Sequence, residues 1–174
     1  MRKLALLVAA FAATVPAANW MIGNVGTVCL PGGPCLIPVG FGLTAPSGVL
    51  LVGVALVLRD MVHEAGGAKA AIAAIFIGGV LSALFAPAAL VVASVLAFVL
   101  AELADMFVYA PLREKRLGLA VFASGAVGAI VDSVVFLALA FGSLEYVEGQ
   151  VLGKLWMSLL AFAFIASRRR WVQA

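Results

Sequence analysis

The sequence has few charged residues: only 11% of its 174 residues are Asp, Glu, Lys or Arg, against about 25% in an average soluble domain. It contains one histidine and two cysteines, whereas hydrophobic residues make up 66% of the chain. A chain of this size cannot remove so much apolar surface from water when it folds. The composition therefore excludes a soluble globular domain, a disordered tail and a disulfide-rich secreted scaffold. It indicates an all-α integral membrane protein.

Common catalytic motifs are also missing. The sequence contains no G-x-x-x-x-G-K-[ST] phosphate loop, no G-x-S-x-G and no H-E-x-x-H. Its single histidine, His63, leaves little for acid–base or metal chemistry. Asp105 and Asp132 are the only candidates for a paired-aspartate protease, and they are expected at different membrane depths. We therefore expect no enzyme activity, no cofactor, no metal site and no nucleic-acid partner.

Apolar runs divide the chain into six predicted transmembrane helices, because about 20 apolar residues cross a bilayer. Pro-rich, Gly-rich or charged stretches separate the runs. The chain is too short for an additional soluble domain, so residues 1–174 are predicted to form one six-helix domain. The predicted spans are residues 4–22, 47–62, 69–85, 89–109, 117–141 and 151–166.

Basic residues lie on alternate sides of these spans. Lys and Arg occur before the first span, after the second, after the fourth and after the sixth, and the three opposite loops have none. By the positive-inside rule, the N-terminus and the C-terminus are both cytoplasmic. Residues 1–18 could also be read as a cleaved signal peptide, but we expect a retained first span. The predicted location is the plasma membrane, in a prokaryotic or phage-encoded setting.

Both cysteines fall in the first outer loop, where residues 23–46 are rich in Gly and Pro. Cys29 and Cys35 flank a Leu-Pro-Gly-Gly-Pro turn, which can bring two cysteines within bonding range. An oxidising compartment would permit a disulfide there. The alternative is a pair of buried free thiols.

Four ionisable residues stand out inside the predicted spans, where charge is costly and usually faces a cavity or a partner. Glu102 and Asp105 share one helical face, Asp132 lies mid-span, and Lys154 lies one turn into the last span. Lys154 could pair with Asp132, and Arg59 could reach Asp105 near the inner face. We expect no cation at the depth of Glu102. Arg59 and Asp60 are otherwise read as a solvated helix end, and His63 as an interfacial residue.

Aromatic side chains could line the same cavity. The candidates are Phe98, Phe107, Tyr109, Phe136 and Trp156. The alternative for each is ordinary packing or anchoring at the membrane interface.

The region from Ala97 to Leu160 resembles a known family. It reads Ala-Glu-Leu-Ala-Asp at 101–105, Val-Tyr at 108–109, a basic loop, Gly-Ala-Ile-Val-Asp-Ser at 128–133, and then Lys154. With Leu58–Val62 and the following Gly-Gly, this resembles the VUT family of queuosine-precursor transporters. That family is related to the vitamin-uptake substrate-binding subunits of energy-coupling factor systems. The two cysteines have no counterpart that we can match.

The resemblance implies import of a 7-deazaguanine, such as the 7-cyano or 7-aminomethyl compound. It implies Glu102, Asp105, Asp132, Lys154 and Tyr109 as substrate-binding residues, with carboxylates accepting the paired N–H groups of the guanine-like edge. An energy-coupling subunit or a homodimer is compatible with it. The alternatives are a vitamin-binding subunit of an energy-coupling factor transporter and a structural membrane protein that binds no ligand.

Overall fold

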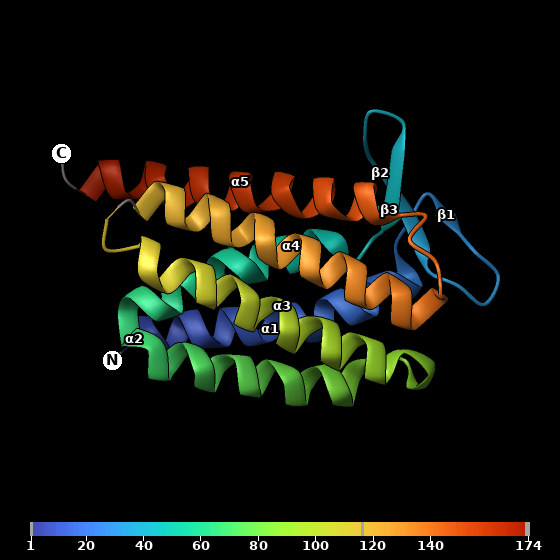
Figure 1. Ribbon diagram of the computed structural model, residues 1–174, viewed down its shortest axis with the longest axis horizontal. Coiled ribbons are helices and arrows are strands. Elements are labelled where there is room, and N and C mark those ends of the chain that lie inside the picture. The colour runs from blue at the N-terminus through green and yellow to red at the C-terminus, as the bar shows by residue number, and fades with distance from the viewer. Residues whose placement is uncertain (1, 116, 173–174) are drawn as a thin grey trace.

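The computed structural model describes residues 2–115 and 117–172, which form a bundle of long helices with a small sheet at one end (Figure 1). The helices are α1 (Arg2–Asn24), α2 (Val49–Phe85), α3 (Val91–Leu112), α4 (Leu117–Phe141) and α5 (Val147–Val172). A short 3₁₀ helix, η1 (Ala88–Leu90), precedes α3, and the strands are β1 (Val28–Cys29), β2 (Cys35–Gly40) and β3 (Leu43–Pro46).

Helix α2 is two helices joined at a glycine. Gly67 has φ 74° and ψ −179°, which is not helical and is a conformation that essentially only glycine adopts. The chain reverses there, so residues 49–66 and 68–85 run in opposite directions along the bundle (Figure 1). This break produces the second and third of the helical segments that the sequence predicts.

Helix length and composition fit a membrane protein. Four helices among the described residues are long and apolar enough to cross a membrane, namely α1, α2, α3 and residues 119–141 of α4. Large apolar side chains on their outer faces, such as Phe76 and Phe107, are 73% and 82% exposed. Such exposure is unfavourable in water but suits contact with lipid.

The segment expected to be an irregular loop contains a three-stranded antiparallel sheet of order β1-β2-β3. Val28 pairs with Leu36 and Cys29 with Cys35. A disulfide joins Cys29 to Cys35, whose Cα atoms are 3.8 Å apart. The sheet is therefore an addition to the helical bundle that the sequence analysis did not predict.

One helix ends later than predicted. The fourth span was predicted to end at residue 109, but α3 continues to Leu112 with Pro111 in its last turn. The third span was predicted to end at residue 85, and α2 ends there, at Phe85, before η1.

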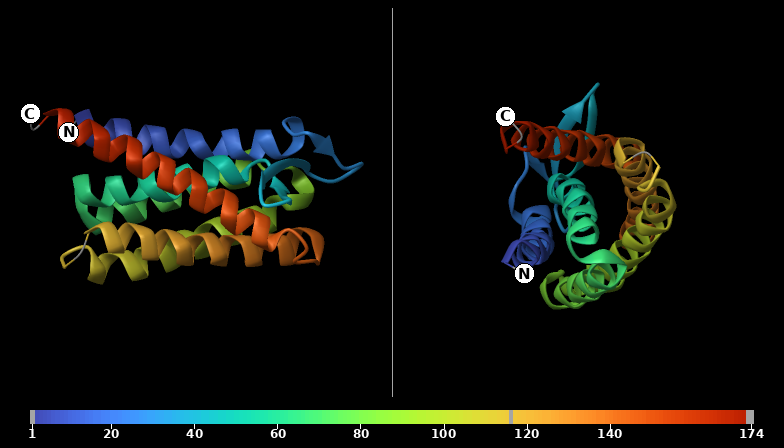
Figure 2. Two further views of the ribbon diagram at one scale, coloured as in Figure 1. Left: turned by 90° about the horizontal axis from the view of Figure 1, so that it is seen from above. Right: turned by 90° about the vertical axis from the view of Figure 1, so that its left-hand side faces the viewer.

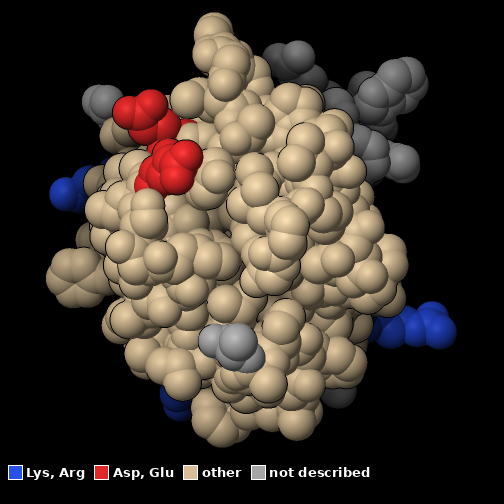
Figure 3. All heavy atoms as spheres, turned by 90° about the vertical axis from the view of Figure 1, so that its right-hand side faces the viewer, with Lys and Arg blue, Asp and Glu red and all other residues tan. Residues whose placement is uncertain are grey.

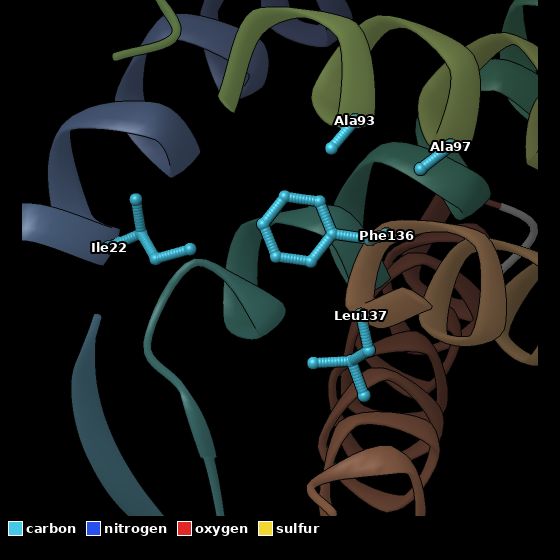
Figure 4. Packing of buried hydrophobic residues seen from close by; sticks show 5 residues of the cluster. All are labelled: Ile22, Ala93, Ala97, Phe136 and Leu137. Atoms are coloured by element: carbon cyan, nitrogen blue, oxygen red, sulfur yellow. The ribbon is translucent and has the colours of Figure 1, made fainter. Parts of the chain in front are cut away.

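One cluster of apolar side chains lies where α1, α3 and α4 meet. Phe136 lies between Ile22 of α1 and Ala93 of α3, and Leu137 and Ala97 complete the cluster (Figure 4). The two alanines leave room for the phenylalanine ring. Helices α3 and α4 pack closely against each other along their length (Figure 2).

Small residues allow α2 and α5 to come close together. A Cβ atom on Gly53 would lie 2.5 Å from the Lys154 carbonyl oxygen and 2.9 Å from the Met157 Cβ. Both contacts are shorter than van der Waals distances, and one of them is with backbone. The α2–α5 approach therefore requires glycine at position 53.

We expect Gly53→Ala to lower the free energy of unfolding by about 1–3 kcal/mol, because overpacking forces the two helices apart. The measurement is thermal or denaturant unfolding of the purified protein in detergent. Gly125→Ala is the matched control, since a Cβ there would meet nothing within 4 Å. Equal effects of the two substitutions would contradict the packing argument.

Candidate functional site

One buried arginine forms ion pairs with three carboxylates inside the bundle. Arg59 on α2 is fully buried, and its Nη1 lies 2.8 Å from Oδ1 of its neighbour Asp60. Its Nε lies 3.0 Å from Oε2 of Glu102, and its Nη2 lies 2.5 Å from Oδ2 of Asp105. Glu102 and Asp105 are three residues apart on α3 and therefore share the face that meets α2. We call Arg59, Asp60, Glu102 and Asp105 the Arg59 cluster.

Two expectations about this cluster were wrong. Arg59 and Asp60 were read as a solvated helix end, but they are 0% and 4% exposed. Glu102 was expected to have no cation at its depth, but Arg59 binds it. The physical reason is that a guanidinium on a long side chain can bind carboxylates one turn apart on a neighbouring helix. The expected contact between Arg59 and Asp105 is present.

A second polar group extends the Arg59 cluster toward the end of the bundle where α1 begins and α5 ends. The Tyr109 hydroxyl donates to Glu64 Oε1 at 2.9 Å, and Arg113 Nη1 lies 3.0 Å from the same oxygen. The Tyr109 ring lies 5.7 Å from the Arg59 guanidinium carbon and 5.4 Å from the His63 ring. His63 is buried among these side chains.

An ion pair joins α4 and α5 nearer the sheet. Lys154 Nζ lies 2.7 Å from Asp132 Oδ2. The same nitrogen donates to Ser133 Oγ and to Gln150 Oε1, each at 2.7 Å. All three ammonium donors are therefore used. Lys154 is 1% exposed, whereas the Asp132 side chain is 12% exposed and so retains access to the space beside it.

The two charged groups lie at different levels of the bundle. A Cβ atom on Gly128 would lie 3.0 Å from the Asp105 Cβ, so this turn of α4 is level with the Arg59 cluster. Asp132 is four residues further along α4, which is about 6 Å toward the sheet. The Asp132–Lys154 pair is thus roughly one helical turn closer to the sheet than the Arg59 cluster.

A cavity adjoins the Asp132–Lys154 pair. It comprises about 680 Å³ of empty space, its open mouth included, and α1, α2, α3, α4 and α5 all contribute to its wall. Two aromatic side chains, Phe98 and Phe136, line it, and most of the remaining wall is aliphatic. The polar side chains in the wall are Thr14, Asn19, Ser82, Ser94, Asp132, Gln150 and Lys154.

The structure separates the residues predicted to bind a substrate. Asp132 and Lys154 line the cavity, as do the aromatic candidates Phe98 and Phe136. Glu102, Asp105 and Tyr109 are instead held by Arg59 and Glu64 and are not among the lining residues of this cavity. The other two aromatic candidates, Phe107 and Trp156, are 82% and 45% exposed on the outside of the bundle.

Five polar lining residues were missed by the sequence analysis, among them Gln150 and Asn19. Gln150 lies four residues before Lys154 on α5 and hydrogen bonds to it, so helical spacing from Lys154 would have found it. Asn19 on α1 donates its amide to the Val15 carbonyl at 3.0 Å. No sequence signal distinguishes it from other polar residues near a helix end.

The surface at the sheet end is poor in charge. Figure 3 shows acidic side chains at one edge of this face and basic ones only at its periphery. The loop segments at this end, residues 25–48 and 86–90, have no charged residue, and residues 142–148 have Glu145 and Glu148. The cavity therefore lies in the half of the molecule that has no exposed cation in its loops.

We expect Arg59→Gln to lower the free energy of unfolding by about 3–5 kcal/mol, because it leaves buried carboxylates without their cation. Arg113→Gln is the matched control. The Arg113 side chain is 29% exposed and that of its partner Glu64 is 36% exposed. Loss of such an exposed ion pair lowers the free energy of unfolding by about 0–1 kcal/mol. Thermal unfolding in detergent measures both. A small effect of Arg59→Gln on the free energy of unfolding would show that the Arg59 cluster does not hold α2 and α3 together.

Comparison with known proteins supports a transport function. Residues 87–167, somewhat less than half of the chain, match the family model described as "Putative vitamin uptake transporter". No curated protein and no solved structure gives a significant match. The matched segment contains α3, α4 and most of α5, and hence Glu102, Asp105, Asp132 and Lys154. Together with the apolar helices, this match supports a multi-pass membrane protein whose residues 87–167 are similar to that transporter family.

Proposed function

We propose that this protein imports a queuosine precursor, a 7-deazaguanine such as the 7-cyano or 7-aminomethyl compound, across a prokaryotic plasma membrane. The observation that carries the proposal is the cavity whose wall combines the Asp132–Lys154 pair with Phe98 and Phe136. The family match supports transport of a small molecule. The resemblance of residues 97–160 to queuosine-precursor transporters supports the substrate.

The chemistry of the wall matches that of a guanine-like base. One edge of such a base presents a carbonyl oxygen, an N–H and an amino group in sequence. Asp132 can accept from the N–H and the amino group in parallel, as carboxylates do with paired donors. The Gln150 amide nitrogen can donate to the carbonyl, because Lys154 uses only the Oε1 of that side chain. In a largely apolar cavity, such pairing discriminates strongly against bases that lack it.

The aromatic residues suit the flat faces of the base. Phe98 comes from α3 and Phe136 from α4, and both line the cavity with Asp132. Stacking on an aromatic ring is worth about 1–3 kcal/mol per base. The two classes of contact together select for a planar, polar-edged solute.

The proposed topology has six spans formed by α1, the two halves of α2, α3, α4 and α5. Both ends of the chain then face the cytoplasm, because the basic residues lie at that end of the bundle. Figure 1 shows the beginning of α1 and the end of α5 at the same end of the molecule. The cavity then opens toward the outside, as an importer needs, and residues 1–174 act as one domain.

Two further assignments belong to the proposal. Glu102, Asp105 and Tyr109 act one level below the cavity and fix the position of α3 through Arg59 and Glu64. Energy coupling could involve a partner subunit, and the carrier could act as a homodimer. The second candidate function is binding of a vitamin, which the description of the matched family favours.

We expect 7-cyano-7-deazaguanine to raise the thermal stability of the purified protein. A ligand at one hundred times its Kd adds about 2.7 kcal/mol to the free energy of unfolding. Asp132→Asn removes the acceptor and should abolish this shift. Phe136→Leu keeps the ion pair and should weaken binding by about tenfold or more, since a stacking contact is lost.

The matched controls are Glu145→Gln and Phe107→Ala, because both side chains are exposed away from the cavity. They should keep the wild-type shift. A shift with a vitamin but not with a deazaguanine would retain the transporter and refute the substrate. An undiminished shift in Asp132→Asn would refute the site.

A further inference from the structure

The Arg59 cluster contains more negative than positive charge. One guanidinium faces three carboxyl groups, and Arg59, Asp60, Glu102 and Asp105 are all at most 4% exposed. With every carboxyl ionised the cluster would have a net charge of −2. Burying uncompensated charge costs several kcal/mol per ion even after relaxation. A positive charge beyond Arg59 must therefore enter the cluster.

The geometry favours a proton over a metal ion. Each carboxylate binds a different nitrogen of the guanidinium: Asp60 at Nη1, Glu102 at Nε and Asp105 at Nη2. The guanidinium thus occupies the centre on which the oxygens converge. No group of three or more acidic, histidine or cysteine side chains with metal-binding geometry exists among the described residues. A proton needs no such cage, because it binds one oxygen.

Glu102 is the carboxyl group best placed to exchange that proton. It makes a single contact with Arg59, through Oε2. On α3 it lies four residues after Phe98, which lines the cavity, whereas Asp105 lies a further turn away. Glu102 is therefore the member of the cluster nearest the cavity along α3.

Groups on the other side of the cluster connect it to the opposite end of the bundle. His63 is 3% exposed and its Nδ1 has no hydrogen-bond partner in the described chain. Its ring lies 5.4 Å from Tyr109, whose hydroxyl donates to the partly exposed Glu64. Tyr109, whose ring lies beside Arg59 and His63 and whose hydroxyl donates to Glu64, thus connects the buried cluster to a carboxylate that meets solvent.

We propose that the Arg59 cluster is a proton-coupling site and that Glu102 holds the coupled proton. The proposal rests on the transport function proposed above. A proton enters from the cavity side and binds a Glu102 oxygen, and the carboxyl loses its negative charge. After the solute is released, the proton leaves toward Glu64 and the carboxylate forms again beside Arg59. One proton thus moves inward with each solute.

Several charged and titratable groups lie on the helices that surround Glu102. On α2 and α3 these are Arg59, Asp60, His63, Asp105 and Tyr109, and on α4 and α5 they are Asp132 and Lys154. Asp132 and Lys154 neutralise each other, and Glu64 with Arg113 lies at the exposed edge. The unbalanced charge is therefore that of the Arg59 cluster.

The first test is uptake of radiolabelled 7-cyano-7-deazaguanine into proteoliposomes with the membrane potential clamped. Wild type should accumulate solute about tenfold per unit of inward pH gradient for one proton, and a protonophore should abolish the accumulation. Glu102→Gln should lose accumulation but keep solute counterflow, because the cavity is unchanged. Glu145→Gln should behave as wild type. Accumulation by Glu102→Gln, or wild-type accumulation driven by a Na⁺ gradient instead, would overturn the proposal.

A second measurement needs no substrate and separates the two proposals. Infrared difference spectra between acidic and neutral pH should show a protonated-carboxyl C=O band that disappears in Glu102→Gln and persists in Glu145→Gln. If wild type neither binds nor exchanges a deazaguanine, the substrate proposal fails and this band still decides the proton site. A band unchanged by Glu102→Gln would overturn the assignment of the proton to Glu102.

Discussion

The ion cluster around Arg59 is the constraint on which the rest of the bundle depends. One buried guanidinium binds carboxylates from α2 and α3, and it fixes the relative height of those helices. Because α3 packs along α4, that height also determines where Asp132 meets Lys154 on α5. A buried ion pair is weak evidence for stability, but loss of one partner is costly. The cluster therefore specifies an arrangement more than it adds free energy.

The molecule keeps its two charged groups at separate levels. The Asp132–Lys154 pair is neutral, has its donors satisfied and borders a cavity lined by two aromatic side chains. The Arg59 cluster is buried, has an excess of acidic groups and is not part of that cavity wall. An uncharged, planar solute suits the first environment, and a proton suits the second. Under the two proposals made above, this division places solute binding and proton coupling one helical turn apart.

Much of the helical architecture could be predicted from the sequence, because long apolar runs and proline or glycine breaks determine where helices begin and end. The sheet could not, since a Gly- and Pro-rich stretch gives no alternating strand pattern, even though each strand pairs with its neighbour along the chain. The Asp132–Lys154 pair was predictable from the positions of the two residues within their predicted membrane spans. The burial of Arg59 was not: its place near a predicted helix end indicated solvent, and only the packing of α2 on α3 turns it inward. For the same reason the sequence could not show that Asp132 lines the cavity and that Glu102 does not.

The most direct test of the account is a structure of the protein with 7-cyano-7-deazaguanine bound. The account predicts the base in the cavity, stacked against Phe98 or Phe136, with its N–H and amino group on Asp132 and its carbonyl near the Gln150 amide. It also predicts no solute atom within hydrogen-bond distance of Glu102. A base bound directly to Glu102 or Asp105, with Asp132 turned away from it, would contradict the division between a binding level and a proton level.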